Sequence, residues 1–246
     1  MSTRTLLGLW AHPDDEAYLS AGLMYEFTQR GDHVVVVTAT SGQHGTGDPA
    51  AWPPDRLAPL RRAELAASLA QLGVREHYVL EYEDGRCRDV DGTDAFAAYI
   101  VAVDPDVIVT FGPDGITGHP DHRAVSRWAT DAWNATGHRA ELWYATLTPD
   151  FHQRWGHVNA MAGLFADQPA PPSTPHDLLA HLVGLDGVAL DAKLAALHAH
   201  RSQTEGLVTL VGPTVYREWW RVEAFRAAVR RPDRGPRRRV LEDVQR

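Results

Sequence analysis

Residues 5–16, Thr-Leu-Leu-Gly-Leu-Trp-Ala-His-Pro-Asp-Asp-Glu, decide the fold, because an apolar run passes directly into a polar loop. The apolar run at residues 5–10 predicts a buried strand. Residues 17–30 follow with apolar side chains at helical spacing, and Gly31 stands where a helix would be capped. Residues 34–37 are all valine, which is typical of a strand buried on both faces of a parallel sheet.

The same alternation of strands and helices continues along the first part of the chain. Helices are predicted at residues 59–72, 94–103 and 121–135, and strands at residues 77–80, 107–110 and 141–145. Alternation at this spacing indicates an α/β fold with a mostly parallel sheet, and right-handed crossovers favour a doubly wound, Rossmann-like arrangement.

The second part of the chain is less regular. A proline-rich connector is expected at residues 168–175, helices at 190–200 and 218–229, and a basic tail at 230–246. We therefore expect a single domain over residues 1–246. Its Rossmann-like core would span residues 1–146, and a smaller, irregular C-terminal portion at 147–229 would border the pocket.

The composition is that of an ordinary globular protein, with 44% hydrophobic and 23% charged residues. A net charge of −8 argues against nucleic-acid binding, which needs a basic surface. Cys87 is the single cysteine, so no intrachain disulfide can form. No apolar stretch approaches the ~20 residues that span a bilayer. The segment before the first polar motif is too short for a signal peptide, so we expect a cytoplasmic protein.

Two polar motifs follow strands that should be neighbours in this sheet. His-Pro-Asp-Asp-Glu at residues 12–16 comes after the first strand, and Gly-His-Pro-Asp-His at residues 118–122 after the fourth. In the common strand order 3-2-1-4-5, these strands adjoin and the sheet reverses its direction of growth between them. That reversal opens a crevice above the carboxyl ends of the strands, where such folds bind ligands. The two motifs are therefore expected to meet.

The residue types in both motifs suit a catalytic zinc site. Zn²⁺ prefers imidazole nitrogens and carboxylate oxygens, and three protein ligands leave a fourth position for water. The motifs hold more such groups than three ligands require, which fits hydrolysis, because hydrolysis also needs a base and a proton donor. Each motif alone could instead cap a helix or form a polar turn. Two His/Asp clusters at matching strand ends favour a functional site.

The two motifs resemble the markers of the LmbE-like, or PIG-L, family of zinc-dependent N-deacetylases. Members of this family act mostly on N-acetylglucosamine groups. Weaker family-like segments follow in the expected order at residues 38–42, 61–73, 84–85 and 193–203. The resemblance implies that zinc is held by His12, Asp15 and His122. Fe²⁺ or Co²⁺ would suit the same ligands nearly as well.

The resemblance also implies roles for residues around the metal. Asp14 would be the general base, and a protonated His119 would stabilise the tetrahedral intermediate and assist the leaving amine. Arg61 and Asp84 would hold the sugar. Thr117 stands where deacetylases of thiol precursors carry a tyrosine, so that tyrosine's role is absent or filled from elsewhere.

Three other residues have open roles. Asp121 would either orient a histidine or face solvent at the start of its helix. His200 could reach the site from the second half of the chain, although a lone histidine on a helix is more often structural. Cys87 lies in a polar loop and has no evident role as a nucleophile.

The function implied is removal of an acetyl or other acyl group from the amide nitrogen of an N-acetylglucosamine-type sugar conjugate. The alternative is a metal-dependent amidase that acts on a thiol conjugate or a longer N-acyl group. The loops at residues 41–54 and 147–175 would decide between them, and a homo-oligomer is left open. A dinucleotide-binding oxidoreductase or a serine esterase would need Gly-x-Gly-x-x-Gly or Gly-x-Ser-x-Gly, which are absent. A non-catalytic zinc protein is disfavoured, because base and acid candidates accompany the ligands.

Overall fold

The computed structural model describes residues 3–165 and 172–229, and within them seven strands form one sheet in the order β3-β2-β1-β4-β5-β7-β6. The strands are β1 (Thr5–Trp10), β2 (His33–Thr40), β3 (Glu76–Tyr82), β4 (Val107–Phe111), β5 (Glu141–Thr146), β6 (His181–Gly184) and β7 (Val222–Ala227). Strands β1 to β5 pair in parallel, whereas β7 and β6 extend the sheet in antiparallel orientation. The predicted α/β fold and the order 3-2-1-4-5 are therefore confirmed.

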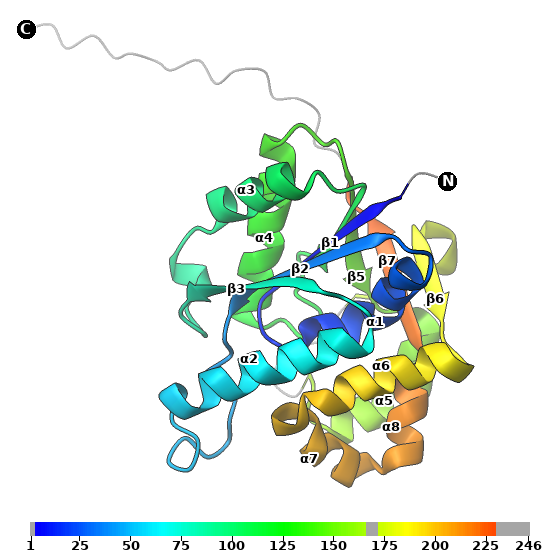
Figure 1. The fold of residues 1–246 in the computed structure, drawn as a ribbon. Coiled ribbons are helices and arrows are strands. Elements are labelled where there is room, and N and C mark those ends of the chain that lie inside the picture. Colours follow the sequence, from blue (N-terminus) through cyan, green and yellow to red (C-terminus); the bar gives the residue numbers. More distant parts are fainter. Residues whose placement is uncertain (1–2, 166–171, 230–246) are drawn as a thin grey trace, which may run out of the picture.

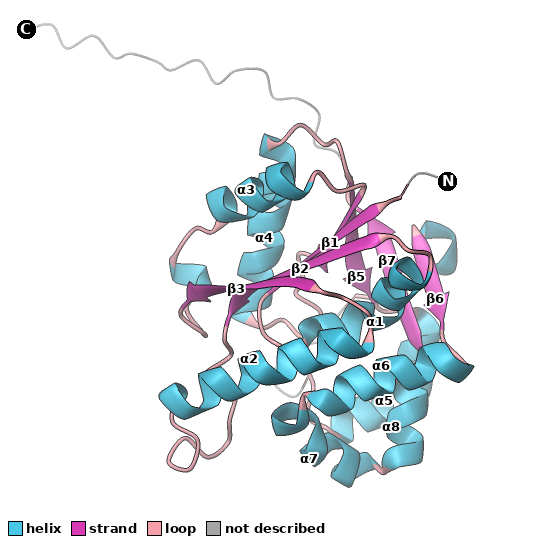
Figure 2. Ribbon diagram, in the orientation of Figure 1, coloured by secondary structure: helices cyan, strands magenta, loops and turns pink. Residues whose placement is uncertain are grey.

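Helices cover both faces of the sheet (Figure 2). They are α1 (Asp15–Gln29), α2 (Pro54–Gln71), α3 (Thr93–Val103), α4 (Pro120–Ala135), α5 (Pro149–Met161), α6 (Gly187–Ala199), α7 (Arg201–Val211) and α8 (Pro213–Trp219). Helices α3 and α4 pack together on one face, while α6 packs against both α1 and α2 on the other. Figure 1 shows α7 and α8 together below α6, where they extend the C-terminal part of the chain.

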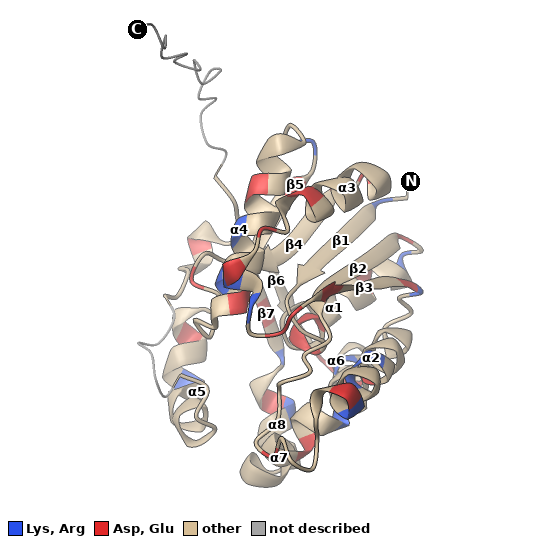
Figure 3. Cartoon of the chain, turned by 90° about the vertical axis from the view of Figure 1, so that its left-hand side faces the viewer, with Lys and Arg blue, Asp and Glu red and all other residues tan. Residues whose placement is uncertain are grey.

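The central strands are mostly apolar, and Figure 3 shows β1, β2 and β4 without Lys, Arg, Asp or Glu. Leu7 is paired with Val35 on one side and with Ile108 on the other. Trp10 at the end of β1 packs edge-on against Phe111 at the end of β4, with ring centroids 5.0 Å apart. The two strands therefore end level, and the loops that follow them begin side by side.

The C-terminal portion corrects one prediction. Residues 218–229 were expected to form a helix, but α8 ends at Trp219 and Val222–Ala227 is strand β7. Apolar residues in this segment suit either period, and β7 is a strand because it fills the gap between β5 and β6. Helices α5 and α7 and strand β6 have no counterpart in the prediction, and α2 begins at Pro54, with Pro59 inside it.

Some predictions cannot be compared with the structure. The basic tail at 230–246 lies outside the described residues, as does the first half of the expected connector at 168–175. Over the described ranges, no helix is both long enough and apolar enough to cross a membrane. The cytoplasmic location stays a prediction.

Candidate active site

The seven residues expected to bind the metal, catalyse the reaction or hold the sugar all line one pocket of about 440 Å³. They are His12, Asp14, Asp15, Arg61, Asp84, His119 and His122. Residues from both loops that were expected to border it, such as His44 and Phe151, also contribute to its wall. The pocket opens at the carboxyl ends of β1 and β4, as expected for a doubly wound sheet.

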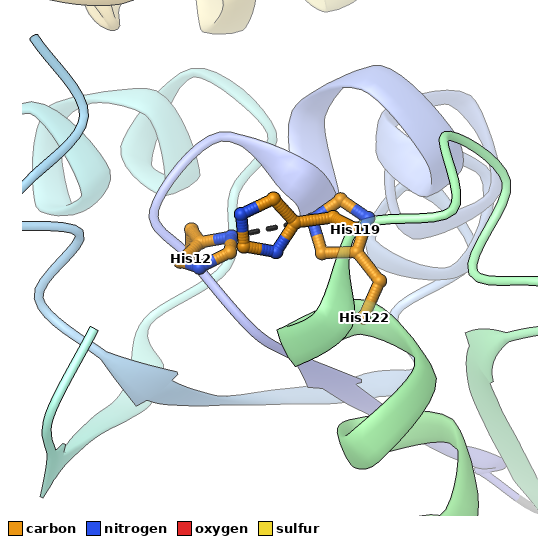
Figure 4. A group of neighbouring side chains, drawn as sticks. All are labelled: His12, His119 and His122. Carbon is orange, nitrogen blue, oxygen red and sulfur yellow. Dashed lines mark hydrogen bonds between the residues drawn. The ribbon is translucent and has the colours of Figure 1, made fainter. Parts of the chain in front are cut away.

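Three histidines of the pocket lie close together (Figure 4), and we call this part of the pocket its floor. His12 follows β1 directly, while His119 and His122 lie at the start of α4, so the pairing of β1 with β4 brings them together. His12 Nδ1 lies 3.2 Å from His122 Nε2, and the His119 ring centroid is 5.0 Å from each of the other two. Nitrogens of these three residues form a group that could hold a metal ion.

Asp15 adds a carboxylate to this cluster. Its Oδ1 lies 3.3 Å from His122 Nε2, and its Oδ2 lies 3.6 Å from His12 Nδ1. A tetrahedral zinc ion with bonds of ~2.0–2.1 Å spaces its ligand atoms roughly 3.3 Å apart. The donor atoms of His12, Asp15 and His122 therefore have the chemistry and the mutual spacing that a divalent ion of this kind requires.

Hydrogen bonds select which nitrogen of each histidine faces the centre. His12 Nε2 lies 3.0 Å from Asp84 Oδ1 and 3.2 Å from Asp121 Oδ2, so this nitrogen carries the proton and Nδ1 faces inward. His122 Nδ1 lies 3.0 Å from the Gly115 carbonyl, which leaves Nε2 facing inward. A carboxylate or carbonyl behind a histidine is the usual arrangement at metal sites.

Asp121 is fully buried and orients the site, which settles its open role. Its Oδ2 accepts a hydrogen bond from Gly85 N at 2.6 Å and its Oδ1 accepts one from Cys87 N at 3.1 Å. Burial raises the pKa of Asp121, but the hydrogen bonds with His12 and Gly85 N outweigh it and keep that pKa low. Cys87 is buried beneath it, and burial raises the pKa of the thiol, so the structure gives no support to a nucleophilic cysteine.

Negative charge is concentrated around His12. Burial lowers the pKa of His12, but the hydrogen bonds to Asp121 and Asp84 and the charge of Asp15 outweigh it and raise that pKa to about 10. The pKa of Asp84 is lowered: burial acts in the other direction, and the hydrogen bond to His12 overcomes it. An environment that holds a positive charge this strongly also favours a bound cation.

Asp14 sits in a strained turn that other residues hold in place. Its φ of 117° is in the left-handed region, which non-glycine residues seldom adopt. Arg61 Nη2 donates to Asp14 Oδ2 at 3.1 Å and to the Pro13 carbonyl at 2.5 Å, and Nη1 donates to the Gly42 carbonyl at 2.7 Å. A Cβ at Gly42 would lie 2.1 Å from Arg61 Nη1, so only glycine leaves room for this contact.

The ionisation of Asp14 suits a base. Burial raises the pKa of Asp14 to about 6, against the opposing charge of Arg61. Arg61 thus holds the catalytic loop, while the sugar contact inferred from the resemblance stays a prediction. Asp84 also has partners within the protein, because its Oδ2 accepts a hydrogen bond from His44 N at 2.8 Å in addition to the contact with His12. Its predicted contact with the sugar likewise stays a prediction.

Glu16 supports the Asp14 loop and Glu64 contacts α7, and no role was predicted for either residue. Glu16 Oε2 accepts a hydrogen bond from Asp14 N at 3.0 Å, and its Oε1 lies 2.8 Å from His200 Nε2 in a fully buried pair. Glu64 accepts hydrogen bonds from Ser202 N at 2.8 Å and Oγ at 2.6 Å. His200 therefore reaches the site through Glu16. The sequence pattern that could have indicated a role for Glu64 is the Arg-x-x-Glu spacing of Arg61 and Glu64 on one helix.

The surroundings of His119 determine its protonation. Its Nδ1 accepts a hydrogen bond from Asp121 N at 3.2 Å, so in the neutral ring the proton is on Nε2. Burial and the neighbouring His12 lower the pKa of His119, which favours this neutral form at pH 7. In this form the ring can donate through Nε2–H, and the protonated His119 expected during the reaction stays a prediction.

Comparison with known proteins identifies the family. A model of the GlcNAc-PI de-N-acetylase (PIG-L) family matches residues 7–133, a stretch that contains both motifs. A protein of Mycolicibacterium gilvum named 1D-myo-inositol 2-acetamido-2-deoxy-alpha-D-glucopyranoside deacetylase is 33% identical over 233 residues, which cover 82% of each chain. The chain belongs to the PIG-L family. The family expected from the two motifs is therefore confirmed.

Solved structures show how widely the architecture of this PIG-L chain is shared. A teicoplanin deacetylase in its zinc-inhibited form aligns with a TM-score of 0.69 at 18% identity, covering 93% of this chain and 99% of the other. A 4-carboxy-2-hydroxymuconate hydratase from Pseudomonas putida aligns with a TM-score of 0.58 at 15% identity, covering 95% and 100%. Because the fold hosts different reactions, the function of this PIG-L member must be argued from its site.

Proposed function

We propose that the chain is a metal-dependent hydrolase that removes an acetyl group from the amide nitrogen of an N-acetylglucosamine-type sugar conjugate. One observation carries this proposal. The inward-facing atoms of His12, Asp15 and His122 lie 3.2–3.6 Å from one another, and Asp14 lines the same pocket beside them. Membership of the PIG-L family and the names of the relatives support the reaction type.

The ion would be held by His12, Asp15 and His122, with zinc as the first candidate and Fe²⁺ or Co²⁺ as substitutes. When bound, it would polarise the amide carbonyl and make a water molecule more acidic. His119 lies within the same cluster, but its nitrogen Nδ1 is already engaged by Asp121 N. This engagement favours a role for His119 toward the substrate.

Asp14 would act as the general base. Its carboxylate is held by Arg61, and with a pKa of about 6 it is ionised at neutral pH and able to take a proton from the attacking water. Nε2–H of His119 would donate a hydrogen bond to the carbonyl oxygen as that oxygen gains negative charge. The proton for the departing amine would come from Asp14, which holds the one taken from the water, or from the protonated form of His119.

An assay of amine release tests the proposal. Purified protein, loaded with Zn²⁺, is incubated with N-acetylglucosamine and its simple glycosides, and free amine and acetate are measured. We expect equal amounts of both products, loss of activity after chelation, and recovery when the metal is returned. Release of neither product from any N-acyl glucosamine by metal-loaded protein would rule the proposal out.

A further inference from the structure

One side of the pocket is apolar, in contrast to its charged floor. The wall includes Tyr18 and Leu19 of α1, Ile116 of the loop before α4, Phe151 of α5, Leu207 of α7 and Trp220 after α8. Three of these six residues, Phe151, Leu207 and Trp220, come from outside residues 7–133, the segment that carries the two motifs. An acetyl group has a single methyl, which covers little of such a wall.

The apolar wall begins next to the catalytic carboxylates. Tyr18 N donates to the Asp14 carbonyl at 3.0 Å, so Tyr18 follows Asp14 by one helical turn. The Tyr18 ring packs against Trp220 at 4.6 Å between centroids, and Trp220 stacks on Trp219 at 4.5 Å. These contacts hold the aromatic part of the wall in place before a substrate arrives.

Ile116 lies in the loop just before the second motif. It precedes His119 by three residues, is 6% exposed, and lines the pocket. Its φ of 62° is in the left-handed region, which is unfavourable for a β-branched side chain. Such strain is usually retained at functional positions. Here it places an apolar side chain in the lining of the pocket.

Several polar groups of the pocket already form hydrogen bonds within the protein. Arg61 donates to Asp14, Pro13 and Gly42, and Asp84 accepts from His44 N. Asn159 Oδ1 accepts from Trp219 Nε1 at 3.0 Å, and Gln203 Nε2 donates to the Gly45 carbonyl at 3.1 Å. A polyol attached to the sugar would have to compete with these bonds, whereas an alkyl or aryl group would not.

We propose that the pocket selects substrates that carry an apolar group of several carbons close to the scissile amide, either as the N-acyl chain or as the aglycone of the sugar. This rests on the proposed deacetylase function and specifies its substrate class. Both sources present the same chemistry to the wall, namely apolar surface that leaves water on binding.

Two substrate series separate the sources. The first holds the N-acetyl group constant and varies the aglycone from methyl to butyl to octyl, with an inositol glycoside as the polyol control. The second uses N-acetyl, N-butanoyl and N-octanoyl glucosamine. We expect kcat/KM for amine release to rise about three- to fourfold per added methylene over the first few carbons in one series. The series that rises identifies the source.

A binding measurement separates this inference from the proposed function. Calorimetry compares octyl with methyl glucoside, and octanamide with acetamide, below the concentrations at which micelles form. Tighter binding of the longer member of a pair, with no amine released from any N-acyl sugar, would uphold the apolar subsite and overturn the deacetylase. Affinity and kcat/KM that do not change with chain length, or a preference for the inositol glycoside, would overturn the subsite.

Variants on the wall test which residues are responsible. Leu207→Gln on α7 and Phe151→Gln on α5 should each reduce the gain in kcat/KM between methyl and octyl, or acetyl and octanoyl, by about tenfold. Leu210→Gln is the matched control, because Leu210 is on the same helix as Leu207 but is 51% exposed and lies outside the pocket lining. A gain that falls equally in the control would contradict the assignment.

Discussion

Asp14 and Asp15 are neighbours in the chain but face different partners. Asp14 contacts Arg61, whereas Asp15 contacts His12 and His122. The separation arises because Asp14 occupies a left-handed turn and Asp15 is the first residue of α1. Asp15 can therefore bind the ion while the adjacent Asp14 contacts the attacking water, because the two carboxylates do not occupy the same position.

Asparagine substitutions should separate these roles. Asp14→Asn retains size but cannot accept a proton, so it should keep its metal and lose activity by a factor on the order of 10²–10⁴. Asp15→Asn should instead bind metal more weakly and recover part of its activity in excess metal. Metal content and kcat measured for both variants check this. Loss of metal in Asp14→Asn with retention in Asp15→Asn would reverse the assignment.

The pH dependence of the wild type follows from the pKa of Asp14. The base works only when ionised, and burial raises its pKa to about 6, so kcat/KM should fall as the pH drops through about 6. Arg61 lowers that pKa, so removing its charge in Arg61→Met should move the acid limb to higher pH. The loss of charge-assisted hydrogen bonds should also reduce kcat/KM by ~10- to 100-fold.

Arg62→Met is the control for this pH shift. Arg62 is adjacent on α2, but its Nε donates to Ser41 Oγ at 2.6 Å rather than to Asp14. Its acid limb should coincide with that of the wild type. A higher KM in Arg61→Met with an unmoved acid limb would instead show that Arg61 contacts only the substrate.

At the scale of elements, a buried ion pair joins three parts of the fold. Lys193 of α6 donates to Glu223 of β7 at 2.7 Å and to the Tyr18 carbonyl of α1 at 2.8 Å. Glu223 also accepts hydrogen bonds from Gly22 N at 2.7 Å and Leu23 N at 3.0 Å. Both side chains are fully buried, so the C-terminal portion is fixed to the helix that carries Asp15.

Breaking this pair should destabilise the protein strongly. Glu223→Gln leaves the Lys193 charge buried without a counterion, which typically costs about 3–5 kcal/mol in the free energy of unfolding. Urea unfolding measures the loss. The double variant Lys193→Met/Glu223→Gln should recover part of it, because no charge is left unpaired.

The exposed pair between Arg217 and Asp191 provides the comparison. Asp191 is also on α6, but its side chain is 63% exposed, so Asp191→Asn should change stability little. Equal losses in Glu223→Gln and Asp191→Asn would mean that the buried pair contributes no more than a surface contact.

At the scale of the whole molecule, the candidate metal ligands connect the start of the chain with its middle. His12 follows β1 and His122 lies in α4, so an ion held by both would stabilise the folded state only. Metal at about 100 times its Kd should add ~2.7 kcal/mol to the free energy of unfolding. Thermal unfolding with and without a chelator, together with metal analysis, should show one ion per chain.

Histidine variants test that connection. His12→Ala/His122→Ala should lose both the bound metal and the thermal shift. His33→Ala should retain both, because His33 is an exposed residue at the start of β2 whose partner is Glu76. Stoichiometric metal in the double variant would contradict the assignment of His12 and His122 as ligands.

The sequence by itself determined the parallel core, the meeting of the two motifs and the family. Runs such as residues 34–37 report burial directly, and parallel strands place the residues that follow them at one edge of the sheet. These features depend on local pattern and on the rules of strand connection, so they needed no knowledge of other contacts.

Only the tertiary structure decided which strands pair in the C-terminal part and which side chains contact the catalytic loop. Residues 222–227 form a strand because an antiparallel gap between β5 and β6 accepts them, although their local pattern also suits a helix. Arg61 holds Asp14, and His200 reaches it through Glu16, from helices far apart in the chain. Periodicity reports which face of an element is buried but not what covers that face, so contacts of this kind follow only from the packed molecule.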